Sequence, residues 1–258
     1  MNPGGDSDDI ALAATLILMR EVQGSAPELL VLERASTMAF AAGALVFPGG
    51  RVEPGDFDLA DTLSGGSADE REQTAQRIAA IRETIEEVGV AIAIDPLPDA
   101  ATVDMLRKGL IEGRSFSTLL GEANARLNPE VLTPFARWRP PRKVARRFDT
   151  RFFIAEAPMQ AVESADGKES VRTLWAPVRA LLDDAQAGHH HLIFPTWCTL
   201  ERLAQFGSFA EARADGLRYG HHLASGHLRS DGDQEWLYVD EGIGYPVTRR
   251  LLRAEERG

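Results

Sequence analysis

Three glutamates lie close together in the segment "RETIEEVGV", which runs from Arg82 to Val90 and contains Glu83, Glu86 and Glu87. Positions three and four residues apart are neighbours on a helix, so the three carboxylates are expected to share one face. Like charges gathered in this way repel each other unless a cation or an arginine compensates them. Mg²⁺ prefers oxygen ligands of this kind. The segment therefore indicates either a metal site or a solvated acidic surface beside Arg82.

A glycine- and proline-rich stretch, "VFPGGRVEPGD", precedes the glutamates and ends at Asp56. A short strand over residues 43–47 is expected to end at Pro48, which lacks a ladder donor, and at the Gly49–Gly50 pair, which permits positive φ. A carboxylate helix that faces such a loop can supply ligands for a metal that also binds substrate phosphates.

The glutamates must be positioned by a helix, and the pattern predicts one over residues 67–88. Ser67 and Glu70 form a capping box at its start, and Gly89 is typical of a left-handed C-terminal cap. An apolar stripe at spacings of three and four predicts the buried face, with the glutamates on the opposite side; its members are Ile78, Ile81, Ile85 and Val88.

The rest of the chain alternates strands with helices. Turn residues separate apolar runs at 10–19 and 28–34, which predicts a hairpin. Further strands are expected at 147–158 and 171–177, and further helices at 101–127 and 195–206, with an irregular β extension over 217–252. These elements predict an α/β or α+β sandwich.

Composition excludes several classes of protein. The 258 residues carry 28 Lys and Arg against 39 Asp and Glu, a net charge of −11, which argues against duplex nucleic acid as the partner. The lone Cys198 excludes an intramolecular disulfide and a cysteine zinc cluster. The acidic start and the lack of a long apolar run predict neither a secretion signal nor a membrane partner, and favour a cytoplasmic location.

The glycine loop and the glutamate segment together resemble the Nudix hydrolase signature. Gly50 matches the first glycine, and Val90 closes the motif; between them Arg82, Glu83, Glu86, Glu87 and Gly89 fit their positions. Asp56 stands where the family has Glu, and Thr84 occupies an apolar position. In addition, 25 residues separate Asp56 from Arg82, where the signature has seven.

The resemblance implies a Nudix-type α/β/α sandwich with a mixed β-sheet. Residues 1–258 would form a single Nudix domain, with a loop and helix insertion at about 57–75 inside the signature and a helical insertion at about 99–135. Lengthening a surface loop adds only about 0.6 kcal/mol per doubling. The motifs "FPGGRVEPGD", "LTPFARWRPP" and "RFDTRFF" resemble the subgroup that includes peroxisomal acyl-coenzyme A diphosphatases and bacterial relatives.

The resemblance also implies roles for individual residues. Glu83, Glu86 and Glu87 would hold Mg²⁺ or Mn²⁺, and together with Arg82 they are the catalytic candidates. Arg82 would pair with Asp56 and so fix the loop against the helix. Loop positioning is assigned to Gly49, Gly50, Glu53 and Asp56. The family often adds a glutamate from a later loop; Glu156, Glu163 and Glu169 are candidates here, and Glu169 is the first choice.

A basic segment at 137–151 concentrates seven Arg and Lys in this acidic chain. Arginine and lysine suit phosphate groups, although pairing with surface acids is the alternative. The residues proposed for phosphate binding are Arg139, Arg142, Lys143, Arg146 and Arg147.

The function implied by the resemblance is metal-dependent hydrolysis of the diphosphate linkage in a nucleoside diphosphate derivative, with coenzyme A or acyl-coenzyme A first among small nucleotide-type substrates. The alternative is a catalytically silent domain that binds a nucleotide ligand as a sensor or interaction module. A homodimer is the default expectation for the assembly.

Overall fold

A computed structural model describes residues 10–37, 42–63, 66–140, 147–158, 161 and 170–252. The strands are β1 (Ala11–Arg20), β2 (Glu28–Arg34), β3 (Leu45–Val46), β4 (Gly49–Arg51), β5 (Ile94–Asp95), β6 (Arg126–Leu127), β7 (Thr133–Trp138), β8 (Phe148–Glu156), β9 (Ser170–Pro177), β10 (Leu223–Ala224), β11 (His227–Asp231), β12 (Gln234–Tyr238) and β13 (Arg249–Leu251). The helices are α1 (Pro54–Leu63), α2 (Ala68–Val88), α3 (Ala100–Ile111), α4 (Phe116–Glu122), the 3₁₀ turn η1 (Pro129–Val131), α5 (Val178–Gln186), α6 (Phe194–Leu203) and α7 (Phe209–Tyr219).

The central sheet is mixed, as predicted. Its strands lie in the order β10-β7-β8-β1-β2-β3, with β4 paired to β1 and β9 paired to β2. The pairs β1–β8 and β10–β7 are parallel, whereas β1–β2, β1–β4, β2–β9 and β7–β8 are antiparallel. The long parallel pairing of β1 with β8 forms the middle of the sheet.

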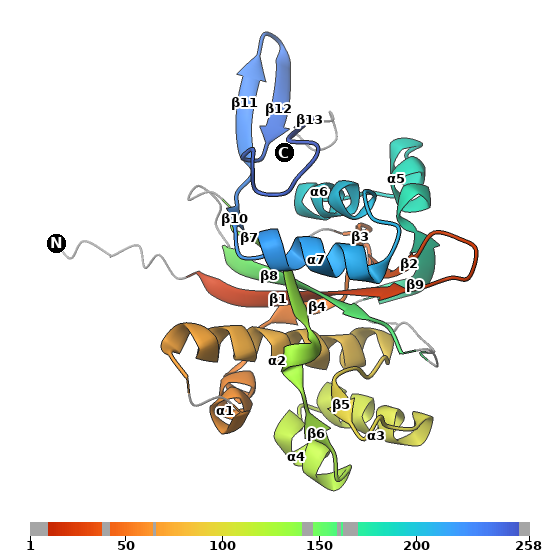
Figure 1. Cartoon of the computed structure of the whole chain (residues 1–258), viewed down its shortest axis with the longest axis vertical. Coiled ribbons are helices and arrows are strands. Elements are labelled where there is room, and N and C mark those ends of the chain that lie inside the picture. The colour runs from red at the N-terminus through yellow and green to blue at the C-terminus, as the bar shows by residue number, and fades with distance from the viewer. Residues whose placement is uncertain are drawn as a thin grey trace, which may run out of the picture.

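Helices cover both faces of this sheet (Figure 1). The long helix α2 crosses one face, with α1, α3 and α4 beyond it, and α5, α6 and α7 cover the other face. Two separate clusters of buried apolar side chains fill the two interfaces. The α/β/α sandwich is therefore confirmed, and within the described residues no helix is both long and apolar enough to cross a bilayer.

Strand β1 contributes to both cores, because alternate side chains point to opposite faces of a sheet. Leu16 and Leu18 pack in the α2 core, whereas Ile17 and Met19 pack in the α6 and α7 core, and all four are buried. A strand buried on both faces reads as a nearly continuous apolar run, which is the pattern of residues 10–19.

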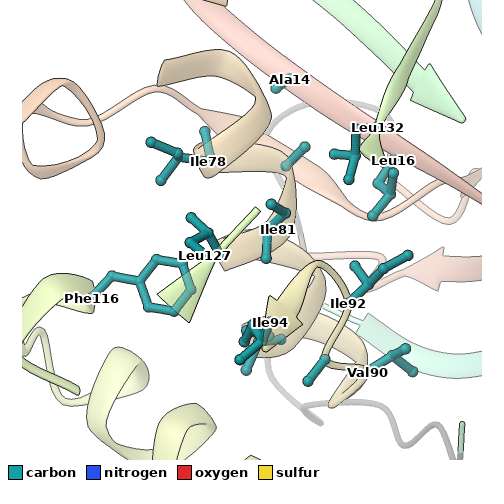
Figure 2. Close-up of a cluster of buried hydrophobic side chains, with 14 of the residues drawn as sticks. Ala14, Leu16, Ile78, Ile81, Val90, Ile92, Ile94, Phe116, Leu127 and Leu132 are labelled. Carbon is teal, nitrogen blue, oxygen red and sulfur yellow. The ribbon is translucent and has the colours of Figure 1, made fainter. Parts of the chain in front are cut away.

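Helix α2 confirms the predicted caps and buried stripe. Ser67 and Glu70 form both bonds of the capping box, and Gly89 ends the helix in the left-handed region with φ of 68°. The stripe side chains Ile78, Ile81, Ile85 and Val88 are fully buried. Figure 2 shows Ile78 and Ile81 of this stripe in one cluster with Leu16 of β1 and Phe116 of α4.

The predicted β1–β2 hairpin forms only at its turn end. Met19 and Arg20 pair with Leu29 and Glu28. Farther from the turn β2 leaves β1, and β4 takes its place: Gly49 pairs with Thr15, and Gly50 pairs with Ala14. The glycine loop is therefore itself a strand of the central sheet, directly beside the middle strand.

The surface loop expected just after Asp56 is wrong, because residues 54–63 form helix α1. Pro54 occupies the first helical position, where its missing N–H costs nothing. Asp56 lies in the first turn and accepts a hydrogen bond from the N–H of Glu53 at 2.8 Å. Leu59 and Ala60 are buried in the α2 core. The expectation of a surface loop over "FDLADTLSGG" missed this short apolar face.

The region at 99–135 is mainly helical, as expected, although β6 and η1 interrupt it and β7 begins at Thr133. The C-terminal region is more regular than the predicted irregular extension. Helix α7 extends to Tyr219, β10 joins the central sheet, and β11, β12 and β13 form an antiparallel sheet that projects from the body (Figure 1). The division into one domain with two insertions stays a prediction.

Candidate active site

An ion pair between Arg82 and Asp56 joins α2 to the start of α1. Arg82 Nε donates to Asp56 Oδ1, and Arg82 Nη2 donates to Asp56 Oδ2, both at 3.0 Å. Both side chains are buried. Two parallel bonds of this kind fix direction as well as distance. The pairing that the family resemblance implied therefore forms despite the shorter Asp side chain and the 25 residues between the partners.

Arg82 also contacts two of the three glutamates. Its Nη1 donates to Glu83 Oε1 at 2.9 Å and to Glu86 Oε1 at 3.0 Å, and its Nη2 donates to the main-chain oxygen of Arg51 at 2.9 Å. One guanidinium thus ties α1, α2 and β4 together. It faces three carboxylates, so the cluster keeps a surplus of negative charge.

The two glycines of β4 allow the main chain to approach its neighbours closely. A Cβ atom on Gly50 would lie 2.3 Å from Glu83 Oε1, and one on Gly49 would lie 2.3 Å from the main-chain oxygen of Ala14. The N–H of Gly49 donates to Glu87 Oε2 at 2.8 Å. The glycine pair therefore lets β4 contact α2 directly, through its main chain.

The glutamates are not a solvated acidic surface. Glu87 is buried, with an exposed fraction of 6%. Burial raises the pKa of Glu83 to about 7, with a further contribution from the charge of Glu86, against the opposing charge of Arg82. Burial likewise raises the pKa of Glu86. For Arg82, burial alone would lower the pKa, but the bonds to Asp56 and the charges of Glu83 and Glu86 raise it above its usual value.

The donor set fits a hard divalent cation in its chemistry. It consists of crowded, partly desolvated carboxylates whose repulsion a cation would relieve. Across the part of the chain that the structure describes, however, no three His, Cys, Asp or Glu side chains converge as a ready-made metal site. The reason lies in the contacts above, because Arg82 holds Glu83 and Glu86 while Gly49 holds Glu87. Metal binding would require these side chains to turn.

Arg107 of α3 is a site-associated residue that the sequence did not reveal. Its Nε donates to the main-chain oxygen of Glu86 at 3.0 Å, and its Nη2 donates to that of Glu87 at 3.1 Å. These carbonyls belong to the last turn of α2, where a helix has unpaired acceptors and favours positive charge. Arg107 therefore anchors the helical region at 99–135 to the turn that carries the glutamates.

The remaining candidates have different outcomes. Glu53 is exposed and contributes its N–H to Asp56. Glu156 is exposed at the end of β8. Arg139 pairs with Asp149, and the main-chain oxygen of Arg147 accepts a bond from the N–H of Ala11. The other candidates lie outside the described residues; they are Glu163, Glu169, Arg142, Lys143 and Arg146.

Comparison with known proteins finds relatives in the predicted family. The chain is 26% identical over 234 residues to the acyl-coenzyme A diphosphatase NUDT19 of Xenopus laevis, a match that covers 71% of this chain and 61% of that protein. It is 26% identical over 266 residues to NUDT19 of Gallus gallus, covering 82% of this chain and 68% of that protein. The chain thus spans about two thirds of the length of these relatives or slightly less. No protein-family model matches it.

One solved structure is similar to this chain in both fold and sequence. The crystal structure of a Nudix hydrolase from Alicyclobacillus acidocaldarius superposes with a TM-score of 0.68 at 29% sequence identity. The match covers 80% of this chain and 96% of that one.

Proposed function

We propose that this chain, a member of the Nudix hydrolase superfamily, hydrolyses the diphosphate linkage of a nucleoside diphosphate derivative with the help of a divalent cation. The observation that carries the proposal is the bidentate bond between Arg82 and Asp56, formed beside Glu83, Glu86 and the close approach of Gly50. The interrupted signature is thereby assembled into one compact cluster.

Each residue of the cluster has a distinct task in this proposal. Arg82 positions rather than reacts, because it links Asp56, the two glutamates and the main chain of β4. Gly49 and Gly50 keep the main chain close to the carboxylates. Glu83, Glu86 and Glu87 are the proposed ligands for Mg²⁺ or Mn²⁺. When bound, such a cation would neutralise diphosphate charge and promote ionisation of the attacking water.

The reaction is a displacement at phosphorus. The oxygen of a water molecule bonds to one phosphorus, and the bond from that phosphorus to the bridging oxygen breaks, which leaves two phosphate monoesters. The proton of the water passes to a carboxylate, for which the cluster offers three buried or half-buried glutamates. Glu169, in the later loop, stays a prediction for an additional base or ligand.

Coenzyme A and its acyl esters are the first substrates to test, because two relatives are named acyl-coenzyme A diphosphatases. NADH, dinucleotides, ADP-ribose and nucleotide sugars follow. Specificity is set by loops outside the signature, so sequence identity of this order does not select among them.

The test is a screen of these compounds with Mg²⁺ or Mn²⁺, with products identified by mass. We expect the wild-type protein to yield two monophosphates from at least one compound, and a chelator to abolish the reaction. The double variant Glu86→Gln, Glu87→Gln should be inactive. Glu72→Gln, at an exposed position on the same helix, is the matched control and should retain activity.

The alternative is a nucleotide sensor that binds without turnover. Tight binding of one compound together with no hydrolysis of any would establish it and overturn the hydrolase. The buried carboxylates favour the enzyme, because a binding module has no need of a crowded and destabilising acidic cluster. The cytoplasmic location and the homodimer stay predictions.

A further inference from the structure

A second charged cluster lies on the other flank of α2. Arg77 of α2 lies nine residues before Glu86, and at about 100° per residue the two side chains leave opposite sides of the helix. Arg77 Nε donates to the main-chain oxygen of Leu132, and its guanidinium lies 5.5 Å from the ring centroid of Phe153 in β8. This flank therefore faces β7 and β8, away from β4 and the glutamates.

Asp149 of β8 is the buried acid of this second cluster, and two arginines occupy both of its oxygens. Arg137 Nε donates to Oδ1 at 2.8 Å, and Arg137 Nη2 donates to Oδ2 at 2.7 Å. Arg139 donates to Oδ2 through both Nε and Nη2. Asp149 has little capacity left for a third arginine.

Arg151 is a third arginine near this acid, and two of its nitrogens lack a hydrogen-bond partner among the residues that the structure describes. It lies on β8 directly opposite Arg137 on β7, and like charges in facing positions destabilise a sheet. Its Nε and Nη1 are buried without a hydrogen-bond partner among the residues that the structure describes. Burial lowers the pKa of Arg151, and the charges of Arg137 and Arg77 lower it further, while the charges of Asp149 and Glu72 act in the opposite direction.

His221, which follows α7, borders the same cluster. Burial lowers its pKa, and the positive charges of Arg151, Arg77 and His222 do so too. Acids are present at the rim: exposed Glu130 pairs with Arg77 at 3.3 Å. The charge of Glu72 and that of Asp69 act on Arg137 from exposed positions early in α2. None of these contacts supplies an acceptor to the buried nitrogens of Arg151 in the described structure.

A buried arginine with unpaired donors calls for a specific explanation, since unpaired buried polar groups are rare and costly. An ordered water would supply an acceptor but no charge. An oxyanion supplies both, and an arginine fork matches a phosphate group.

We propose that Arg151, together with Arg77 and Arg137, forms a binding site for a phosphate group, either free inorganic phosphate or the terminal phosphate of a monoester. The site lies on the flank of α2 opposite the glutamates and does not depend on the proposed hydrolase activity.

The test is calorimetric titration of the full-length protein with inorganic phosphate, in the presence of a chelator and at constant ionic strength set with chloride. We expect saturable binding by the wild type, and a Kd about tenfold higher or more in Arg151→Gln, because charged hydrogen bonds are lost. Arg229→Gln, on the projecting sheet, is the control and should bind like the wild type. A parallel titration with AMP separates the two sources: tighter binding of AMP than of phosphate identifies a monoester site.

Two further variants make the result decisive. Glu86→Gln should bind phosphate like the wild type, which separates this site from the glutamate cluster. Arg151→Lys keeps the charge but loses the fork, so it should weaken binding even if Arg151→Gln fails to fold. Absence of binding by the wild type at tens of millimolar phosphate, or equal Kd values for the wild type and Arg151→Lys, would overturn the proposal.

Discussion

The two flanks of α2 carry ion clusters of opposite balance. On one flank, a single arginine, Arg82, bonds to Asp56, Glu83 and Glu86. On the other, a single acid, Asp149, bonds to Arg137 and Arg139, while Arg151 lies beside them. Both clusters use short, bidentate arginine–carboxylate bonds to join separate elements. The difference teaches that the same bonds which join elements of the fold also leave a local surplus of charge, negative on one flank and positive on the other, and the two proposed ligands carry the opposite sign in each case.

We call the side of α2 with Arg82, Asp56 and the glutamates the acidic flank, and the side with Asp149 and its arginines the basic flank. The largest effect is expected from removing a charge on the acidic flank. Glu86→Gln keeps the shape of the side chain but removes a proposed metal ligand. We expect kcat to fall on the order of 10²-fold or more, as for the loss of one group that stabilises a transition state electrostatically. Steady-state kinetics on the substrate found by the screen would measure this. A fall of less than about threefold would show that the carboxylate surplus serves no catalytic purpose.

The second effect concerns Arg82, the arginine that compensates the negative charge of this flank. Arg82→Met fills similar space but leaves Asp56, Glu83 and Glu86 without their common partner. Breaking a buried ion pair on one side costs about 3–5 kcal/mol, so the free energy of unfolding in urea should fall by this order. Activity should fall with it. Lost activity at unchanged stability would contradict the positioning role of Arg82.

A third comparison tests the close approach of β4 to the acidic flank. A Cβ on Gly50 would collide with Glu83, whereas a Cβ on Gly55 would have nothing within 4 Å. We expect Gly50→Ala to destabilise the protein by about 1–3 kcal/mol and to lower activity. Gly55→Ala, in the first turn of α1, should leave both nearly unchanged. Equal behaviour of the two variants in urea unfolding would show that Glu83 moves aside freely.

The smallest effect is expected on the basic flank, in the way that the stability of the wild type changes with pH in acid. Burial would raise the pKa of Asp149, but the bonds from Arg137 and Arg139 outweigh it and hold the pKa below its ordinary value. In the unfolded chain the pKa of an aspartate is about 3.9. Because the pKa of Asp149 is lower in the folded protein, its ion pairs contribute their full stability above the unfolded pKa, and this contribution is lost as the pH falls through the folded pKa. The free energy of unfolding of the wild type, measured in urea, should therefore decrease below about pH 4.

In Asp149→Asn this loss of unfolding free energy in acid should be absent. We also expect the variant to be less stable than the wild type at neutral pH, because Arg137 and Arg139 lose their shared carboxylate. Asp233→Asn, at an exposed position in the β11–β12 turn, is the control and should follow the wild type. A slope below pH 4 that is the same in Asp149→Asn would show that another acid carries the effect.

Sequence alone predicted what depends on local pattern. The caps and the buried stripe of α2 follow from residue types at fixed offsets, so Ser67, Glu70 and Gly89 could be assigned directly. The partner of Arg82 was suggested by resemblance to a signature. Helix α1 was missed because its apolar face is only a few residues wide and becomes visible only when it packs on α2.

Contacts between distant segments had no signal in the sequence. Arg107 reaches the carbonyls of Glu86 and Glu87 only because α3 packs beside the end of α2. Five members of the basic segment at 137–151 were predicted to bind phosphate, and Arg151 was not among them. Asp149 takes Arg137 and Arg139, and Arg151 is left facing α2 with the unpaired nitrogens. Among the described arginines of this segment, strand register rather than composition places Arg151 opposite Arg137.

The position of Asp56 in the first turn of α1 gives the chain's departures from the signature a common origin. A helix that begins at Pro54 brings its own backbone toward Arg82, so a side chain one methylene shorter than Glu completes the bond. The shorter acid and the start of the extra segment therefore lie in one helix. We expect Asp56→Glu to crowd this buried pair, because the added methylene must fit between side chains that are already in contact.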